Sequence, residues 1–176
     1  MKVLELMHLS LLSLNEDTDD MTREEYADQL LEYFNQAYGE IMRAYYPVFC
    51  EQEICVGTGG QYDLSGLERP FIEAKRLLRR DGRQAEWSVE GSTLFTAPGS
   101  GRILYRYMPD RLAADGDEPV FPADMHYCLS DYAAYRVLSC GSRARQARGE
   151  VYYGSYLSAL GKLGQRKNTR LLKKYS

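Results

Sequence analysis

The feature that most constrains this chain is a stripe of apolar residues between positions 22 and 46. The stripe recurs at steps of three and four, the spacing of one helix face, through Tyr26, Leu30, Phe34, Ala37 or Tyr38, Ile41 and Tyr45. Thr22 and Glu25 fit the capping box Thr-x-x-Glu at the helix start. Pro47 ends the helix, because the residue before a proline avoids helical geometry. The sequence therefore predicts one long amphipathic helix, which other elements must cover.

Three further segments predict helices. Residues 3–13 form a short apolar run, and residues 123–139 follow Pro122, a residue favoured at the first helical position. Gly141 is placed to end that helix. A last helix is expected from Arg143 to about Leu163, with apolar and small residues at helical steps.

The period changes after Pro47. Residues 48–56 alternate imperfectly, as a strand does, and the glycine-rich residues 57–60 predict a turn. Between residues 71 and 108 we expect a four-stranded antiparallel meander with a hairpin at Asp81-Gly82. On propensity alone, residues 71–80 would also suit a helix.

These segments predict the α+β class, as a predominantly α-helical bundle with an inserted small antiparallel β-meander. In this interpretation a single domain spans residues 1–176. Residues 1–47 and 122–163 form the bundle, residues 48–109 the β-sheet insertion, and residues 164–176 a flexible basic tail. Hydrophobic residues make up 44% of the chain and charged residues 27%, as in a soluble globular protein. No apolar run is long enough to span a bilayer, so we expect no membrane contact.

The charge is unevenly distributed. Residues 1–68 hold three basic and fourteen acidic residues, whereas residues 141–176 hold nine basic residues and one acid, Glu150. The net charge of −3 conceals this polarity. Three explanations stay open: folding brings the halves together, the basic segment contacts nucleic acid phosphates, or acidic and basic faces meet between subunits.

Nothing in the sequence indicates an enzyme, a cofactor or a metal site. There is no Gly-x-Ser-x-Gly or His-Glu-x-x-His motif, and the four cysteines form no Cys-x-x-Cys pair. A hydrolase would have to assemble a site from residues such as Asp131 or His126. We therefore predict that the protein has no catalytic, cofactor-binding or metal-binding residues.

The order of segments resembles the head–tail connector (neck adaptor, or tail accessory factor) proteins of tailed bacteriophages. The resemblance rests on the capped helix at residues 22–46, on Trp87-Ser-Val-Glu-Gly91 and on Gly101-Arg-Ile-Leu-Tyr-Arg-Tyr-Met-Pro109. It continues in Phe121-Pro122 and in the helix containing Asp131-Tyr-Ala-Ala-Tyr-Arg136. It covers roughly residues 20–165 as a pattern of segments.

The resemblance implies a structural protein of the virion, found in the bacterial host cytoplasm during assembly. Its partners would be the portal protein and tail proteins, with self-association into a ring of twelve copies on the portal and a contact with packaged DNA in the channel. The candidate portal interface is Lys162, Arg166, Lys167, Arg170, Lys173, Lys174 and Tyr175. The candidate subunit interface is Arg143, Arg145, Arg148, Tyr152, Tyr153 and Tyr156. The alternative function is a nucleic-acid-binding module that uses the basic C-terminal segment.

Overall fold

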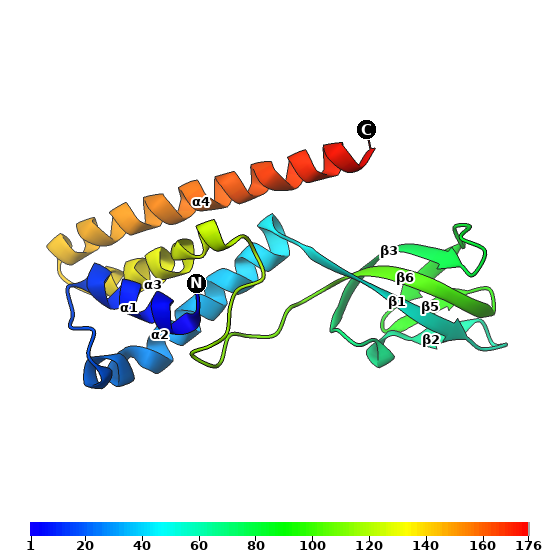
Figure 1. The fold of residues 1–176 in the computed structure, drawn as a ribbon, viewed down its shortest axis with the longest axis horizontal. Helices are drawn as coiled ribbons and strands as arrows, with labels where there is room; N and C mark the ends of the chain where they lie inside the picture. Colours follow the sequence, from blue (N-terminus) through cyan, green and yellow to red (C-terminus); the bar gives the residue numbers. More distant parts are fainter. Residues whose placement is uncertain (176) are drawn as a thin grey trace. The chain divides into compact units, whose positions relative to one another are not determined.

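The computed structural model describes the backbone of residues 1–175 and the side chains of residues 1–165. The chain divides into two compact units (Figure 1). The helical unit comprises residues 1–46 and 110–176, and the β unit comprises residues 47–109. The β unit is thus a continuous stretch of chain inserted into a discontinuous helical unit.

The helical unit is layered around one central helix, α3. It contains α1 (Val3–Leu14), α2 (Asp20–Glu40), a π-helical extension η1 (Ile41–Tyr45), a short 3-10 turn η3 (Ala123–Met125), α3 (Tyr127–Ser139) and α4 (Arg143–Tyr175). Helix α3 packs against α4 on one side and against α1 and α2 on the other (Figure 1). Helix α4 is longer than the predicted helix, which was expected to end at about Leu163.

Apolar stripes form the core of the helical unit, as the sequence predicts. Leu30, Phe34, Ala37, Tyr38 and Ile41 of α2 and η1 are all buried. The matching stripes of α1 and α3 are Val3, Leu6, Met7, Leu11 and Leu14, and Cys128, Leu129, Ala133, Ala134 and Leu138. Ser10 and Ser130 are buried among them and share a hydrogen bond of 2.9 Å, which satisfies both hydroxyls.

The start of α2 differs from the predicted capping box. The helix begins at Asp20, and the Asp19 side chain accepts a hydrogen bond of 2.7 Å from the Thr22 amide. This bond lowers the pKa of Asp19 because it favours the ionised carboxylate. Thr22 therefore lies inside the first turn, and the preceding aspartate caps the helix instead.

The β unit contains two sheets rather than one meander. Strands β1 (Val48–Val56), β6 (Gly99–Tyr107) and β3 (Phe71–Arg79) form one antiparallel sheet in the order β1-β6-β3. Strands β2 (Gln61–Asp63), β5 (Thr93–Thr96) and β4 (Trp87–Glu90) form the other, in the order β2-β5-β4. The 3-10 turn η2 (Leu64–Gly66) follows β2.

One apolar cluster holds the β unit together. Its buried residues come from both sheets: Ile54, Val56, Leu64, Leu67, Ala74, Leu77, Ala85, Leu94, Ile103 and Tyr105. Gly101 allows β6 to approach β3 closely, because a Cβ at this position would lie 2.5 Å from the Leu78 carbonyl oxygen. The two sheets therefore share one core of their own.

The predicted fold class was wrong in its proportions and in its sheet. The part of the chain whose backbone is described contains four α-helices and two three-stranded antiparallel sheets. A predominantly helical bundle with a small inserted meander does not describe this chain. The error has a physical reason: β3 pairs with the distant β6 and not with β4, and local alternation reports where a strand lies but not which strand it pairs with.

No helix in the described part of the chain is long and apolar enough to cross a membrane.

Candidate assembly surfaces

The junction of α3 and α4 is built from tyrosines. Tyr135 of α3 stacks on Tyr153 of α4, with ring centroids 4.5 Å apart and an interplanar angle of 27°. The ring centroids of Tyr132 and Tyr156 lie 5.0 Å apart, with the rings tilted relative to each other. Aromatic pairs in this range attract each other beyond the area they bury. These contacts place four of the fifteen tyrosines of the chain in packing between its own helices.

Tyr156 is a core residue, which corrects its prediction as a subunit contact. Its side chain is only 1% exposed, and its hydroxyl donates a 2.8 Å hydrogen bond to Glu40 at the end of α2. Burial, together with the Glu40 carboxylate, raises the pKa of Tyr156, so the phenol stays protonated. The hydroxyl group that favours tyrosine at interfaces here forms a hydrogen bond between two helices of the same chain.

Two other predicted interface residues join the start of α4 to the end of α1. The Arg148 guanidinium and the Tyr152 hydroxyl both donate to the backbone carbonyl of Ser13, the latter at 3.2 Å. That carbonyl belongs to the last turn of α1, where carbonyl groups lack partners within the helix. Both side chains are half-buried, so the structure gives them an internal role.

The other predicted contact residues lie at the surface or outside the described side chains. Arg143, Arg145 and Lys162 are exposed, and Tyr153 is half-buried against Tyr135. The predicted portal residues Arg166, Lys167, Arg170, Lys173, Lys174 and Tyr175 lie outside the side chains that the structure describes. Their assignment stays a prediction.

A half-buried polar pair lies between α3 and α4. The Ser155 hydroxyl donates a 2.6 Å hydrogen bond to the Asp131 carboxylate. Burial raises the pKa of Asp131, an effect that the bond from Ser155 opposes. Burial and the nearby Asp131 also raise the pKa of the Cys128 thiol to about 12, so the thiol is protonated at neutral pH.

The residues named for a hypothetical hydrolase have separate partners. His126 is buried, and its Nε2 donates to the Phe121 carbonyl at 2.7 Å while Nδ1 lies 2.9 Å from the Met1 nitrogen. The partner of Asp131 is Ser155. Among the described residues, no three His, Cys, Asp or Glu side chains are grouped so as to hold a metal ion.

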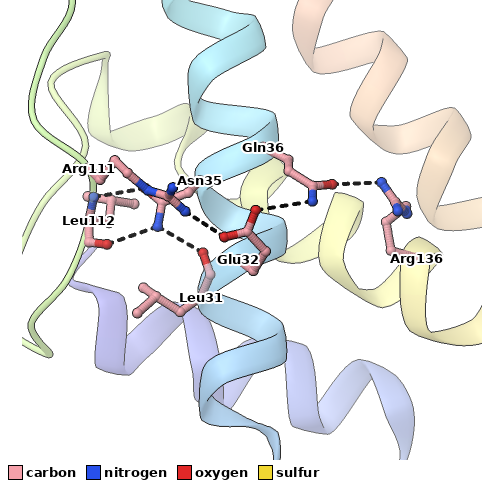
Figure 2. A network of polar contacts seen from close by, with 7 residues as sticks. All are labelled: Leu31, Glu32, Asn35, Gln36, Arg111, Leu112 and Arg136. Atoms are coloured by element: carbon pink, nitrogen blue, oxygen red, sulfur yellow. Dashed lines mark hydrogen bonds and ion pairs between the residues drawn. The ribbon is translucent and has the colours of Figure 1, made fainter.

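Sequence reasoning missed a polar network on the outer side of α2 (Figure 2). The Asn35 side chain pairs with both backbone groups of Leu112, donating to the carbonyl and accepting from the amide at 2.9 Å each. Arg111 forms an ion pair with Glu32 at 2.5 Å. Together these contacts fasten the segment after residue 109 to α2.

The same network reaches α3. Gln36 donates to Glu32 at 3.3 Å and accepts a 2.8 Å bond from Arg136 (Figure 2). The Arg136 guanidinium also lies over the Tyr33 ring, 4.8 Å from its centroid, and donates to the Tyr132 hydroxyl at 2.7 Å. Arginine and tyrosine together are typical of interface surfaces, and here they also join α2 to α3.

The β unit carries a groove with an apolar floor. It has a volume of about 350 Å³ and is lined by Ile54, Val56, Leu77 and Ala85 below Arg79 and Arg80. Both arginines are exposed, and Asp81 lines the groove beside them.

The chain matches the model of a known protein family. The family model described as SU10 adaptor protein matches residues 1–173, almost the whole chain. No curated protein matches it.

Proposed function

This chain belongs to the SU10 adaptor protein family, and from that premise we propose that its copies form a ring on the phage portal vertex, extend the DNA channel and give the tail a docking surface. The family is one of phage head–tail adaptors, so the protein is a bacteriophage structural adaptor of the virion that acts with other capsid and tail proteins. The match over residues 1–173 is the observation that carries the proposal.

Two features of the helical unit support a ring. A ring closes through a heterologous contact, in which two different faces of neighbouring copies meet. The acidic first third of the chain and the basic last segment supply unlike faces. Within the described side chains, Arg143, Arg145 and Lys162 are exposed and form no ion pair, so they are accessible to another molecule.

We propose that the end of α4 reaches the portal. Residues 166–174 contain the basic residues Arg166, Lys167, Arg170, Lys173 and Lys174, which would meet an acidic surface of the portal or DNA phosphates in the channel. The role asks for binding surfaces and no chemistry, as the structural character of the family suggests.

The test is a pull-down of tagged protein from a phage-producing lysate, followed by mass spectrometry. We expect portal protein to be recovered, and to be lost when residues 166–176 are deleted. The deletion starts after Gln165 because Leu163 is fully buried and supports the fold. A matched control is the double variant Arg80→Glu, Arg83→Glu, which reverses two exposed charges in the β unit.

The outcomes separate the two candidate functions. Recovery of portal protein that depends on residues 166–176 supports the adaptor. Recovery of nucleic acid that nuclease removes, without any virion protein, contradicts it and favours the nucleic-acid-binding module.

A further inference from the structure

The groove of about 350 Å³ in the β unit has walls that the chain itself holds in place. One wall is the hairpin at residues 79–85, where the Arg79 amide donates to the Arg83 carbonyl at 2.8 Å. The other wall is the segment at residues 96–101, most of which is exposed. The floor consists of buried apolar side chains: Ile54, Val56, Leu77 and Ala85. The groove is therefore formed in advance and suits an apolar side chain of a partner.

The rim of the groove carries unpaired positive charge. The ionisable side chains that line it are Arg79, Arg80 and Asp81. Asp81 is engaged within the hairpin, because its carboxylate accepts a 3.0 Å bond from the Arg83 amide and pairs with the Arg83 guanidinium at 3.8 Å. Arg79 and Arg80 are exposed and form no ion pair with any described residue. Two cations are thus available beside an apolar floor.

This combination selects the chemistry of the ligand. An apolar side chain fits the floor, and acidic neighbours of that side chain would pair with the two arginines. DNA phosphates would match the arginines but would leave the apolar floor without a contact. Glu53 and Glu86 follow or precede lining residues in the sequence without lining the groove, and they would disfavour a polyanion further. The groove therefore suits an acidic peptide segment with an exposed apolar side chain.

The chain itself contains such a segment at residues 16–28, here called the acidic corner. It has seven acidic residues and one basic residue, Arg23, which pairs with Asp20 at 2.9 Å. Arg145 of α4 adds one positive charge close to the corner, and the acids remain in clear excess. Met21 lies among these acids and is 83% exposed. A methionine side chain is flexible and polarisable, so it adapts to the shape of an apolar groove.

The acidic corner is held rigidly by its own chain. Tyr26 packs on the cluster formed by Leu14, Ala134 and Leu138, which anchors the first turns of α2. Glu24 is exposed and lies one turn after Met21 on the same side of the helix. An ordered segment loses little conformational entropy when it binds, so the corner is prepared for docking.

A second acidic segment, residues 115–120, fits the groove less well. Its apolar residue Val120 is only 46% exposed and has a shorter side chain than methionine. Its Asp117 carboxylate already accepts bonds of 2.8 and 2.9 Å from the amides of Ala113 and Ala114. Met21 is therefore the better occupant.

The acidic corner and the groove lie at the far ends of their own units. From the corner, α2 and η1 run to Tyr45, a length of about 40 Å at 1.5 Å per residue. The groove lies at the Val56 end of β1, about 30 Å of strand from Pro47. Both surfaces are thus remote from Pro47 and Pro109, where the chain passes from one unit to the other.

We propose that the acidic corner of one copy docks in the groove of a second copy, with Met21 on the apolar floor and Glu24 facing Arg79 and Arg80. The contact is heterologous, so each copy binds one neighbour through its corner and another through its groove. The inference rests on the proposed function only in requiring that copies of the chain associate. It identifies the surfaces by which they do so.

A photocrosslinker tests the contact directly. The apolar residue p-benzoylphenylalanine is placed at position 21 of the full chain, which is irradiated at about 1 mM, a concentration that populates even weak association. We expect a covalent dimer whose linked peptide lies within residues 54–56, 77–85 or 96–101. A link to any other segment, a link within one chain, or a chain that stays monomeric in sedimentation at this concentration overturns the proposal. The same crosslinker at position 120 is the control, and a link from there to the groove would also overturn it.

Charge reversal provides a second test at exposed positions, where the fold is preserved. Glu24→Arg and Arg80→Glu should each weaken self-association roughly tenfold, because each places like charges opposite one another. The double variant Glu24→Arg, Arg80→Glu should recover most of the loss. Glu90→Arg, at an exposed position of the β unit outside the groove, is the control and should leave the dissociation constant unchanged.

Two results of this test would overturn the proposal. Single variants that associate like the parent, or a double variant that recovers nothing, would show that these charges do not meet. If Arg80→Glu instead weakens binding of a DNA oligonucleotide and leaves self-association unchanged, the groove is a DNA contact.

The proposal and the proposed function can fail separately. Portal recovery is expected to depend on residues 166–176 and not on the groove, so the Arg80→Glu, Arg83→Glu variant should still recover portal protein although its copies associate more weakly. A chain that recovers portal protein but crosslinks from position 21 outside the groove keeps the function and loses this interface. A chain that recovers no virion protein loses the function, whereas its crosslink still decides whether the corner and the groove meet.

Discussion

The two units of this chain are held together by different kinds of interaction. The β unit has one apolar cluster enclosed by antiparallel backbone ladders. The helical unit adds side-chain bonds that cross from one element to the next, such as Asn35 to Leu112 and Tyr156 to Glu40. Helices satisfy their backbone groups internally, so only side chains can link one helix to another, whereas strands are linked by the backbone itself. Specific contacts between elements therefore depend more on individual side chains in the helical unit than in the β unit.

The difference between the two units is tested most directly by destabilising one hydrophobic core at a time. Leu94→Ala removes a fully buried side chain from the β unit and should cost about 2–5 kcal/mol. Phe34→Ala does the same in the helical unit and should cost about 3–5 kcal/mol. Trp87, the single tryptophan, lies in β4 and reports on the β unit by fluorescence, while far-UV circular dichroism reports mainly on the helices.

We expect Leu94→Ala to shift the fluorescence transition and Phe34→Ala to shift the dichroism transition. If both probes move together in both variants, the units unfold as one and the comparison is wrong.

The next largest loss of stability is expected from a glycine substitution. Gly101→Ala would place a Cβ 2.5 Å from the Leu78 carbonyl oxygen, so β6 and β3 must separate. We expect a loss of about 1–3 kcal/mol, measured by urea unfolding with Trp87 fluorescence. Gly57→Ala is the control, because a Cβ there meets nothing within 4 Å. Equal stability of both variants would show that the ladder tolerates the extra atom.

The corresponding side-chain link in the helical unit is Asn35. Asn35→Ala leaves the amide and carbonyl of Leu112 without their 2.9 Å partners and should cost about 1–3 kcal/mol. Amide hydrogen exchange in residues 110–117 should become faster. Gln29→Ala is the control, since its amide makes only an exposed 3.4 Å bond to Tyr33. Exchange that is unchanged in Asn35→Ala would show that other contacts hold this segment.

The smallest expected effect concerns pH. Burial raises the pKa of Asp131 in the folded state, so the folded protein binds a proton more readily than the unfolded chain, whose carboxyl has the ordinary value of 3.8. This carboxyl therefore lowers stability as pH rises through the folded pKa, and the loss is absent below 3.8.

Asp131→Asn removes the charge and keeps an oxygen that accepts from Ser155. We expect the variant to be more stable than the parent at neutral pH and equal to it in acid, measured by denaturant unfolding across the pH range. Asp17→Asn, at an exposed position, should show no such trend. A variant that is less stable at neutral pH would mean that the bond from Ser155 to the ionised carboxylate outweighs burial.

Periodicity located most elements but not their partners. The apolar stripe of α2 and the strands at residues 48–56, 71–79 and 93–96 lie close to the predicted ranges, because burial on one face imprints a local repeat. The pairing of β3 with β6 joins residues more than twenty positions apart, and no local repeat encodes it. The three-residue strand β2 is too short to leave a repeat at all.

The candidate surfaces were harder to predict. Tyrosine and arginine suit both interfaces and half-buried helix junctions, so the sequence could not separate Tyr156, which is buried, from Arg143, which is exposed. The bond between Asn35 and Leu112 spans 77 positions and ends on a backbone group, which carries no sequence signal. Val151 fell within a predicted helix and Met21 just before one, without any sign that both would be exposed.

The insertion of one unit into the other sets the order in which the chain can fold during synthesis. The β unit, residues 47–109, is continuous and can complete its core as soon as it has left the ribosome. Helices α1 and α2 are made first, yet their main packing partner α3 begins only at Tyr127. Their apolar faces stay uncovered while about 80 further residues are translated, a delay that lasts about 4–16 s at typical elongation rates. The first part of the protein to be made is therefore among the last to be buried.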